Sequence, residues 1–172
     1  MSAVLRSLTA AGPRVRLRPL AEGDRPLVEP WLAEAAAAVR GRGAPREPCG
    51  FQELVRALAA DGWSALFALD LGDGEPSGLL GCQLAPDGDW CTFTFAALRA
   101  GRRVTGYGGE AVLALERRLR EAGLAARFRA GVPHGNGLAV YFWLRIGYRP
   151  LLRSAWEAGF APGRTWMVRT EP

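Results

Sequence analysis

Apolar residues recur along this chain with two different spacings, and the spacing changes several times between residues 14 and 169. Alternating polar and apolar positions, as in RVRLRPL at 14–20, are typical of a half-buried strand. Apolar residues at i, i+3, i+4 and i+7 are typical of a helix with one buried face. Short clusters of Gly, Pro and Asp separate these segments and mark turns. The pattern therefore predicts a domain that mixes strands and helices.

Taken in order, the segments predict the element sequence β-α-α-β-β-β-α-β-α-β-β. Helices are expected at residues 24–39, 51–61, 110–123 and 138–147, the first of them kinked at Pro30. Strands are expected at 14–20, 63–71, 77–85, 90–98 and 126–132, and around 148–156 and 165–169. The turns within 63–98 are too short for a crossover, so these three strands should be antiparallel neighbours.

The length of 172 residues fits one domain, residues 1–172, with a core of its own. The three cysteines, Cys49, Cys82 and Cys91, form no C-x-x-C pair, so neither a disulfide framework nor a metal site is expected. The N-terminus lacks the apolar core of a signal peptide, and no apolar run reaches the length of a membrane span. A cytoplasmic protein with no membrane partner is expected.

The charge is distributed unevenly along the chain. All 22 basic residues are arginine; residues 1–100 hold 10 arginines and 12 acids (net −2), and residues 101–172 hold 12 arginines and 5 acids (net +7). A basic half suits an anionic ligand or nucleic acid. The arginines at 117, 118, 120, 127 and 129 could form a patch, but no aromatic-interleaved or helix-turn-helix signature accompanies them. No nucleic-acid partner is expected.

Three glycines, Gly106, Gly108 and Gly109, lie where the helix at 110–123 is about to begin. Unpaired N–H groups at a helix start bind anions, and glycine lets a phosphate approach the backbone. A Walker A loop needs a lysine, which this chain lacks. A dinucleotide fold needs an acidic residue after the next strand, and 127–135 offers none. A tight turn with close helix packing is the structural alternative.

Two motifs carry a resemblance to a known family. ALRAGRRVTGYGGEAV (97–112) contains R-x-x-G-x-G and is similar to L-R-P-x-x-R-G-x-G-Y-G-x-E-A, departing at Ala100 and Val104. GNGLAVYFWLRIGYRP (135–150) is similar to N-x-x-A-x-x-F-Y-x-x-x-G-F. Both resemble the GNAT superfamily of acyl-CoA-dependent N-acyltransferases, in the branch that acetylates ribosomal-protein N-termini and aminoglycosides. The resemblance covers nearly the whole chain and implies an α/β (α+β) fold with a central mixed, mostly antiparallel sheet.

The resemblance implies acetyl-CoA as the cofactor. Its pantetheine arm would run between splayed strands that end near Leu98 and Val132, and a backbone N–H near Ala97 or Leu98 would polarise the thioester carbonyl. Asn136 would either contact this arm or simply N-cap its helix. The pyrophosphate would lie on the glycine loop, with Arg103 at its mouth, and the residues of that loop are Val104, Thr105, Gly106, Tyr107, Gly108 and Gly109.

The catalytic side chains depart from the family pattern. The family's usual acid is a tyrosine seven residues after the motif asparagine, where this chain has Trp143, and an indole donates a hydrogen bond but not a proton. Tyr141 should face away from that position. The strand at 90–98 has no acid; His134 is a candidate base or an ordinary loop histidine.

The resemblance predicts direct acetyl transfer to a primary amine; the alternative is a non-catalytic CoA-binding module. The acceptor, a small molecule or a peptide, would occupy a groove between the first two helices and the tail. The mild acidity of residues 1–100 favours a cationic amine there. A homodimer is one option for the assembly.

Overall fold

The computed structural model describes residues 2–39, 51–52, 63–86, 88–103, 105–156, 160 and 162–169. Its helices are α1 (Ser2–Ser7), α2 (Arg25–Val39), α4 (Tyr107–Glu121) and α5 (Gly137–Arg145), with 3-10 turns at Glu22–Asp24, Ala100–Arg102 and Arg153–Ala155. Its strands are β1 (Ala10–Ala11), β2 (Arg16–Pro19), β3 (Ser64–Asp70), β4 (Pro76–Leu84), β5 (Trp90–Leu98), β6 (Arg127–Pro133), β7 (Arg149–Pro150) and β8 (Arg164–Arg169).

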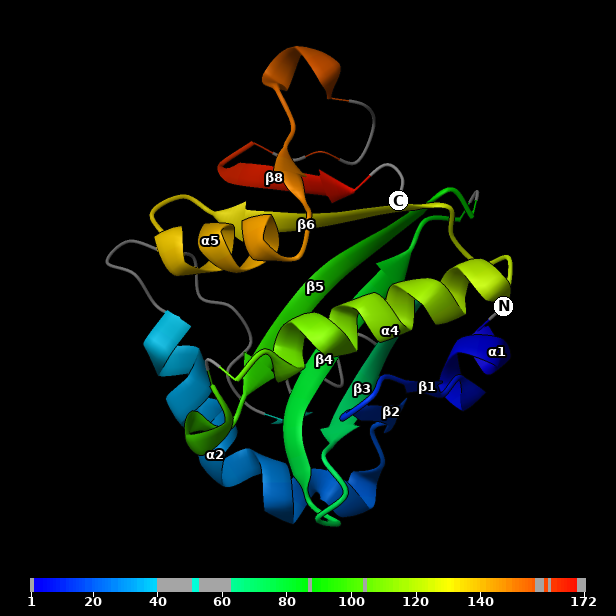
Figure 1. Ribbon diagram of the computed structural model, residues 1–172, viewed down its shortest axis with the longest axis vertical. Helices are drawn as coiled ribbons and strands as arrows, with labels where there is room; N and C mark the ends of the chain where they lie inside the picture. Colours follow the sequence, from blue (N-terminus) through cyan, green and yellow to red (C-terminus); the bar gives the residue numbers. More distant parts are fainter. Residues whose placement is uncertain are drawn as a thin grey trace.

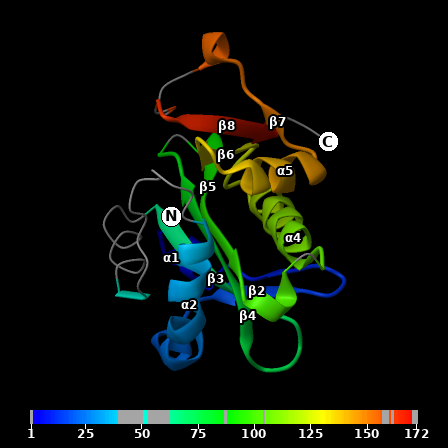
Figure 2. The same cartoon turned by 90° about the vertical axis from the view of Figure 1, so that its left-hand side faces the viewer.

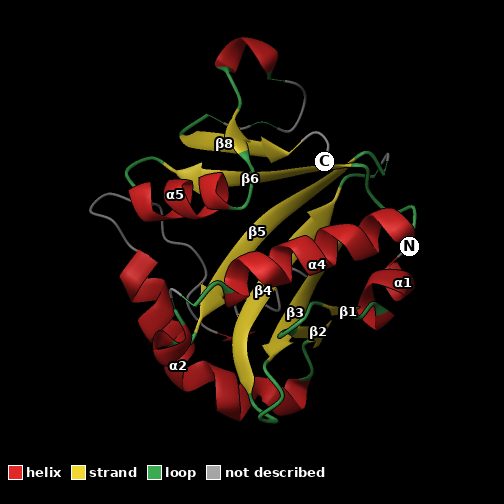
Figure 3. Cartoon of the chain, in the orientation of Figure 1, coloured by secondary structure: helices red, strands yellow, loops and turns green. Residues whose placement is uncertain are grey.

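The strands form one eight-stranded sheet in the order β1-β2-β3-β4-β5-β6-β8-β7 (Figure 3). Every neighbouring pair is antiparallel except β5 and β6, which are parallel. This exception follows from the connections, because short turns can only reverse a strand, whereas α4 carries the chain back across the sheet between β5 and β6. The predicted mixed, mostly antiparallel sheet is confirmed.

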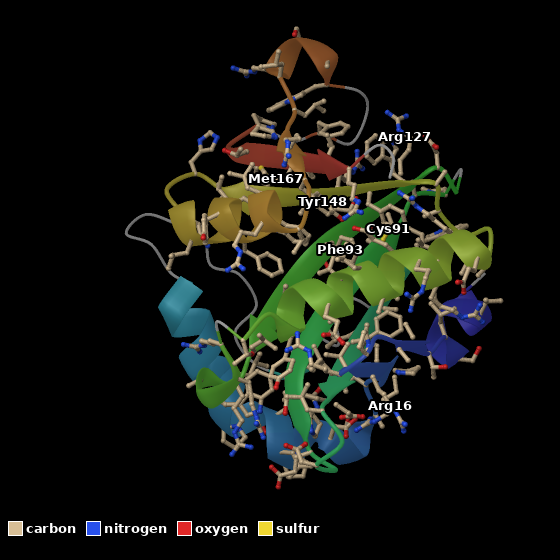
Figure 4. The ribbon with its side chains drawn as sticks, viewed as in Figure 1. Arg16, Cys91, Phe93, Arg127, Tyr148 and Met167 are labelled. Carbon is tan, nitrogen blue, oxygen red and sulfur yellow. The ribbon has the colours of Figure 1, made fainter. Side chains whose placement is uncertain are left out.

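Helices cover both faces of the sheet (Figure 2). On one face α4 and α5 cover the main core, which receives alternate side chains of the central strands, among them Phe93, Phe128 and Ala130. On the other face α2 buries Val28, Trp31 and Leu32 against β3, β4 and β5. In Figure 4, Cys91, Phe93 and Tyr148 lie in the core beneath α4 and α5.

The sheet divides in its middle. β5 and β6 pair only through Trp90–Phe93 and Arg127–Ala130. At this point the β4–β5 register shifts, because Cys82 lies opposite Phe93 while Gly81 lies opposite Phe95. Thr94 is thus an extra residue in β5, and such a bulge bends the strand. Beyond it β5 follows β4 while β6 follows β8, so the two strands diverge (Figure 1). We call the opening between residues 94–98 and 131–133 the split.

The structure differs from the sequence prediction at the two ends of the chain. The short elements α1 and β1 were not predicted, and the strand expected around 148–156 is only β7 followed by the 3-10 turn Arg153–Ala155. Of the helix expected at 51–61, residues 51 and 52 are helical and the remainder lies outside the described residues.

No helix in the described part of the chain is long and apolar enough to cross a membrane.

Candidate active site

The glycine loop runs directly into α4. Gly106 is the N-cap residue and has φ +87°, a left-handed conformation that glycine adopts without strain. The N–H of Glu110 donates to the Gly106 carbonyl at 3.1 Å. The N–H groups of Tyr107, Gly108 and Gly109 precede this bond, so the helix provides no acceptor for them. These are the N–H groups that the sequence analysis expects to bind an anion; Val104 lies outside the described residues.

Close helix packing accounts for part of the glycine pattern. A Cβ on Gly109 would lie 2.6 Å from Cγ2 of Ile146, the C-cap residue of α5, and one on Gly108 would lie 3.4 Å from the Phe142 ring. The close approach of α4 therefore requires that Gly109 has no side chain, whereas a Cβ on Gly108 would make an ordinary contact. The packing interpretation explains Gly109 and the turn interpretation explains Gly106, so neither glycine is by itself evidence of a ligand.

An arginine that the sequence analysis missed lies against the loop. Arg14, in the turn between β1 and β2, donates its backbone N–H and its Nε–H to the Glu110 carboxylate, the second at 2.9 Å. Its guanidinium lies 4.8 Å from the Tyr107 ring centroid and 3.4 Å from where a Gly106 Cβ would be. The loop thus has two cations beside it, Arg14 and Arg103. No sequence signal pointed to Arg14, because β1 and its turn were not predicted.

The direction of the peptide groups at the end of β5 decides which of them face the split. Arg99 N–H donates to the Ser77 carbonyl of β4 at 3.0 Å. Because peptide groups alternate in direction along a strand, Ala97 also faces β4, whereas Leu98 faces the split. The Leu98 carbonyl accepts from Arg103 Nε at 3.2 Å. Of the two N–H groups predicted to polarise the thioester, only that of Leu98 faces the split.

At the start of α5, Asn136 is the N-cap residue, since its Oδ1 accepts from the Ala139 N–H at 3.0 Å. His134 is exposed in the turn directly after β6. Trp143 is 6% exposed and packs on Phe93 with ring centroids 5.6 Å apart, at the residue where β5 leaves β6. Tyr141 is 59% exposed, so it faces away from Trp143 as expected.

The second motif also supplies a structural residue. Tyr148 is fully buried and donates its hydroxyl to the Glu116 carboxylate of α4, which lies 3.6 Å from Arg169 of β8. Burial raises the pKa of Glu116 above its ordinary value and, with the nearby Glu116 charge, that of Tyr148 too. This polar cluster joins α4, the end of α5 and β8 behind the split.

Every carboxylate whose side chain the structure describes has an arginine partner. Each lies within 3.8 Å of an arginine nitrogen; these residues are Glu22, Asp24, Glu29, Asp70, Asp73, Glu75, Asp89, Glu110, Glu116 and Glu121. A free carboxylate base is therefore absent from the described part of the chain.

The arginines considered as a nucleic-acid patch lie in different environments. Arg117 and Arg118 pair with Glu121 on α4. Arg127 pairs with Asp89, and Arg129 is buried against aromatic rings. The structure does not bring these side chains together as one exposed surface.

A mixed sheet that divides around a parallel pair, with a glycine-rich helix start at its opening, defines the class of acyl-CoA-binding acyltransferase folds. No protein-family model and no curated protein matches the sequence, but solved structures do. An acetyltransferase from Thermus thermophilus is 25% identical, with a TM-score of 0.67 over 94% of this chain and 99% of that one.

A probable GNAT-family acetyltransferase from Chromobacterium violaceum is 20% identical, with a TM-score of 0.67 over 94% of this chain and 84% of its own. RimL, the ribosomal L7/L12 alpha-N-protein acetyltransferase, in complex with coenzyme A, is 15% identical, with a TM-score of 0.71 over 94% and 97%. The chain has the GNAT fold, and the predicted fold class is confirmed.

Proposed function

We propose that the protein is an acetyl-CoA-dependent N-acetyltransferase that acts on an amine acceptor. The observation that carries the proposal is the position of the α4 N-terminus at the opening of the split in a GNAT fold. The likeness to acetyltransferases, one of them in complex with coenzyme A, supports the same function.

The described residues fit the cofactor along two stretches. The free N–H groups of Tyr107, Gly108 and Gly109 would hold the pyrophosphate, with Arg103 and Arg14 supplying positive charge. The pantetheine arm would pair with the backbone of Leu98 on the β5 side of the split. Asn136 already caps α5 with its Oδ1, which leaves its amide N–H₂ as the group that could reach this arm.

Acetyl-CoA supplies an acetyl thioester, whose carbonyl carbon forms a C–N bond with the amine as the C–S bond breaks and the thiolate leaves with the electron pair. The Leu98 N–H would donate to the carbonyl oxygen. Trp143 packs on Phe93 where β5 leaves β6, and it stands in the sequence where the family's acid would be. The amine must lose a proton, which we assign to water or to His134 at the open end of the split. Because a thiol has a pKa of about 8.5, the thiolate can leave without a dedicated acid.

The acceptor would approach the sheet from the face opposite α4 and α5, between α2 and the tail. No carboxylate whose side chain the structure describes is free there. The acceptor there would be a small-molecule or peptide amine. One other candidate function is a module that binds coenzyme A without turnover. Two observations favour it: Trp143 stands where an acid is expected, and all described carboxylates are paired with arginines.

The two candidates differ in thiol release. Purified protein is incubated with acetyl-CoA and a panel of amines, and free thiol and N-acetylated product are measured together. The enzyme is expected to release one thiol for each acetylated amine, and only when an amine is present. Calorimetric binding of acetyl-CoA without turnover on any amine supports the module instead, and absence of binding contradicts both.

A further inference from the structure

A cavity lies between α2 and the chain that leaves β5. Its volume is about 460 Å³, which is within the range of small-molecule sites. One wall is apolar and belongs to α2; it consists of Pro26, Leu27, Pro30 and Trp31. The other wall is formed by Glu75, in the turn between β3 and β4, and by residues 99–101. The cavity is therefore bounded by three segments that are far apart in the sequence.

The cavity begins one residue after the position assigned to the thioester. Leu98, whose N–H faces the split, is followed by Arg99 in the cavity wall, and consecutive Cα atoms are about 3.8 Å apart. Arg99 still follows β4, because its N–H donates to the Ser77 carbonyl at 3.0 Å. Ala97, on the other side of Leu98, packs against the apolar cluster that includes Trp31. An amine whose body fills the cavity can therefore reach Leu98 with its nitrogen.

The α2 wall of the cavity contains a buried hydrogen-bond donor without a partner. Trp31 is 6% exposed, and its indole N–H is buried and makes no hydrogen bond within the described part of the chain. Buried polar groups in native proteins are nearly always paired, so the missing partner requires an explanation. A molecule that brings a hydrogen-bond acceptor into the cavity would supply that partner.

The cavity offers no unpaired negative charge to a polycation. Among the described residues that line it, Glu75 is the only acid, and its carboxylate lies 3.0 Å from Nη1 of Arg99. The mild acidity of the N-terminal part predicted a groove for cationic amines, but the described carboxylates of that part are all paired with arginines. Polyamines and aminoglycosides carry several ammonium groups, which would have no partner here.

We propose that the acceptor is a monoamine with an apolar, uncharged body, and that this cavity holds the body next to Leu98; the inference rests on the proposed function. Leu27 is 41% exposed, so a bound body would remove both its own apolar surface and that of Leu27 from water. The Trp31 N–H would donate to an acceptor atom on the body. Aralkylamines are examples of this class.

The test compares kcat/KM for phenethylamine with that for ethylamine, which lacks only the ring, and includes spermidine and kanamycin as polycations. The wild type is expected to prefer phenethylamine to ethylamine by about 10- to 100-fold. Leu27→Glu places a carboxylate in the cavity wall and should reduce this preference to less than about threefold. Val4→Glu is the matched control, because Val4 is a similarly exposed helical residue outside the cavity, and it should keep the preference. Both variants should bind acetyl-CoA as the wild type does.

A second pair of amines tests the Trp31 N–H. Para-methoxyphenethylamine has an ether oxygen where para-ethylphenethylamine has a methylene group, and only the oxygen accepts a hydrogen bond. The wild type should prefer the ether by about 3- to 10-fold. Trp31→Phe, which keeps an aromatic ring but removes the N–H, should show no preference between the two amines.

Equal kcat/KM for phenethylamine and ethylamine, or a preference that Leu27→Glu leaves unchanged, would overturn the inference. Equal rates with the two para-substituted amines in the wild type would overturn the role of Trp31. Calorimetry with acetyl-CoA keeps the two proposals apart. If the wild type binds acetyl-CoA and transfers acetyl only to spermidine or kanamycin, the acceptor inference fails while the proposed function stands. If it does not bind acetyl-CoA, the proposed function fails first.

Discussion

Replacing Gly109 with alanine should push α4 and α5 apart at the candidate active site. The new Cβ would lie 2.6 Å from Ile146 Cγ2, whereas carbon atoms pack at about 3.5–4.0 Å, so the helices must separate by about 1 Å. Overpacking of this kind costs about 1–3 kcal/mol, and the better helix propensity of alanine returns at most about 1 kcal/mol. We expect a net loss of about 1–2 kcal/mol in the free energy of unfolding.

Urea unfolding of three variants tests this magnitude. Gly137→Ala is the matched control, because it is the same substitution in α5 with nothing within 4 Å, and it should not destabilise. Ile146→Leu removes the Cγ2 methyl group, so the double variant Gly109→Ala/Ile146→Leu should recover most of the loss relative to Ile146→Leu alone. A Gly109→Ala protein as stable as Gly137→Ala, or a double variant without recovery, would refute the packing argument.

Three further predictions concern other parts of the chain. Gly106→Ala should cost about 1–2 kcal/mol, since φ is +87° there, and equal stability in thermal unfolding would contradict the assigned turn. Arg14→Gln should raise the Kd for acetyl-CoA by about three- to tenfold at low salt, whereas Glu110→Gln, which breaks the same ion pair but keeps the cation, should raise it less; equal effects would make Arg14 purely structural. Asp24→Asn should lose about 2 kcal/mol at pH 7, because the Arg18 hydrogen bond holds the pKa of Asp24 below its ordinary 3.8. That stabilisation is present above pH 3.8 and is lost as the pH falls through the lowered pKa, so a gap between wild type and variant that does not narrow as the pH is lowered below 3.8 would contradict it.

The central strands were predictable because their patterns are local. The run at 90–98 coincides with β5, since Gly and Asp turns bound an uninterrupted strand pattern. The start of α4 was expected at 110 but lies at Tyr107, because glycines suppress a helix prediction although their N–H groups begin the helix. α1 and β1 were missed since each is too short to show a period.

The site was only partly predictable, for a physical reason. Motif residues such as Asn136 and Gly106 are recognised from sequence spacing, and the structure shows the local roles that both occupy. Arg14 pairs with Glu110 from a turn that is far from either motif in the sequence. Its position depends on how the turn after the two-residue strand β1 packs against α4, and no local pattern encodes that packing.

The central claim is that the start of α4 binds the pyrophosphate of acetyl-CoA, and one pair of variants tests it directly. Thr105 is exposed in the loop, so Thr105→Glu and Thr105→Gln differ in charge without disturbing the α4–α5 packing that any side chain on Gly108 would meet. Calorimetric titration with acetyl-CoA should give one-to-one binding to the wild type and to Thr105→Gln, and a Kd at least about tenfold weaker for Thr105→Glu. Equal affinities for the two variants, or no binding by the wild type, would contradict the account.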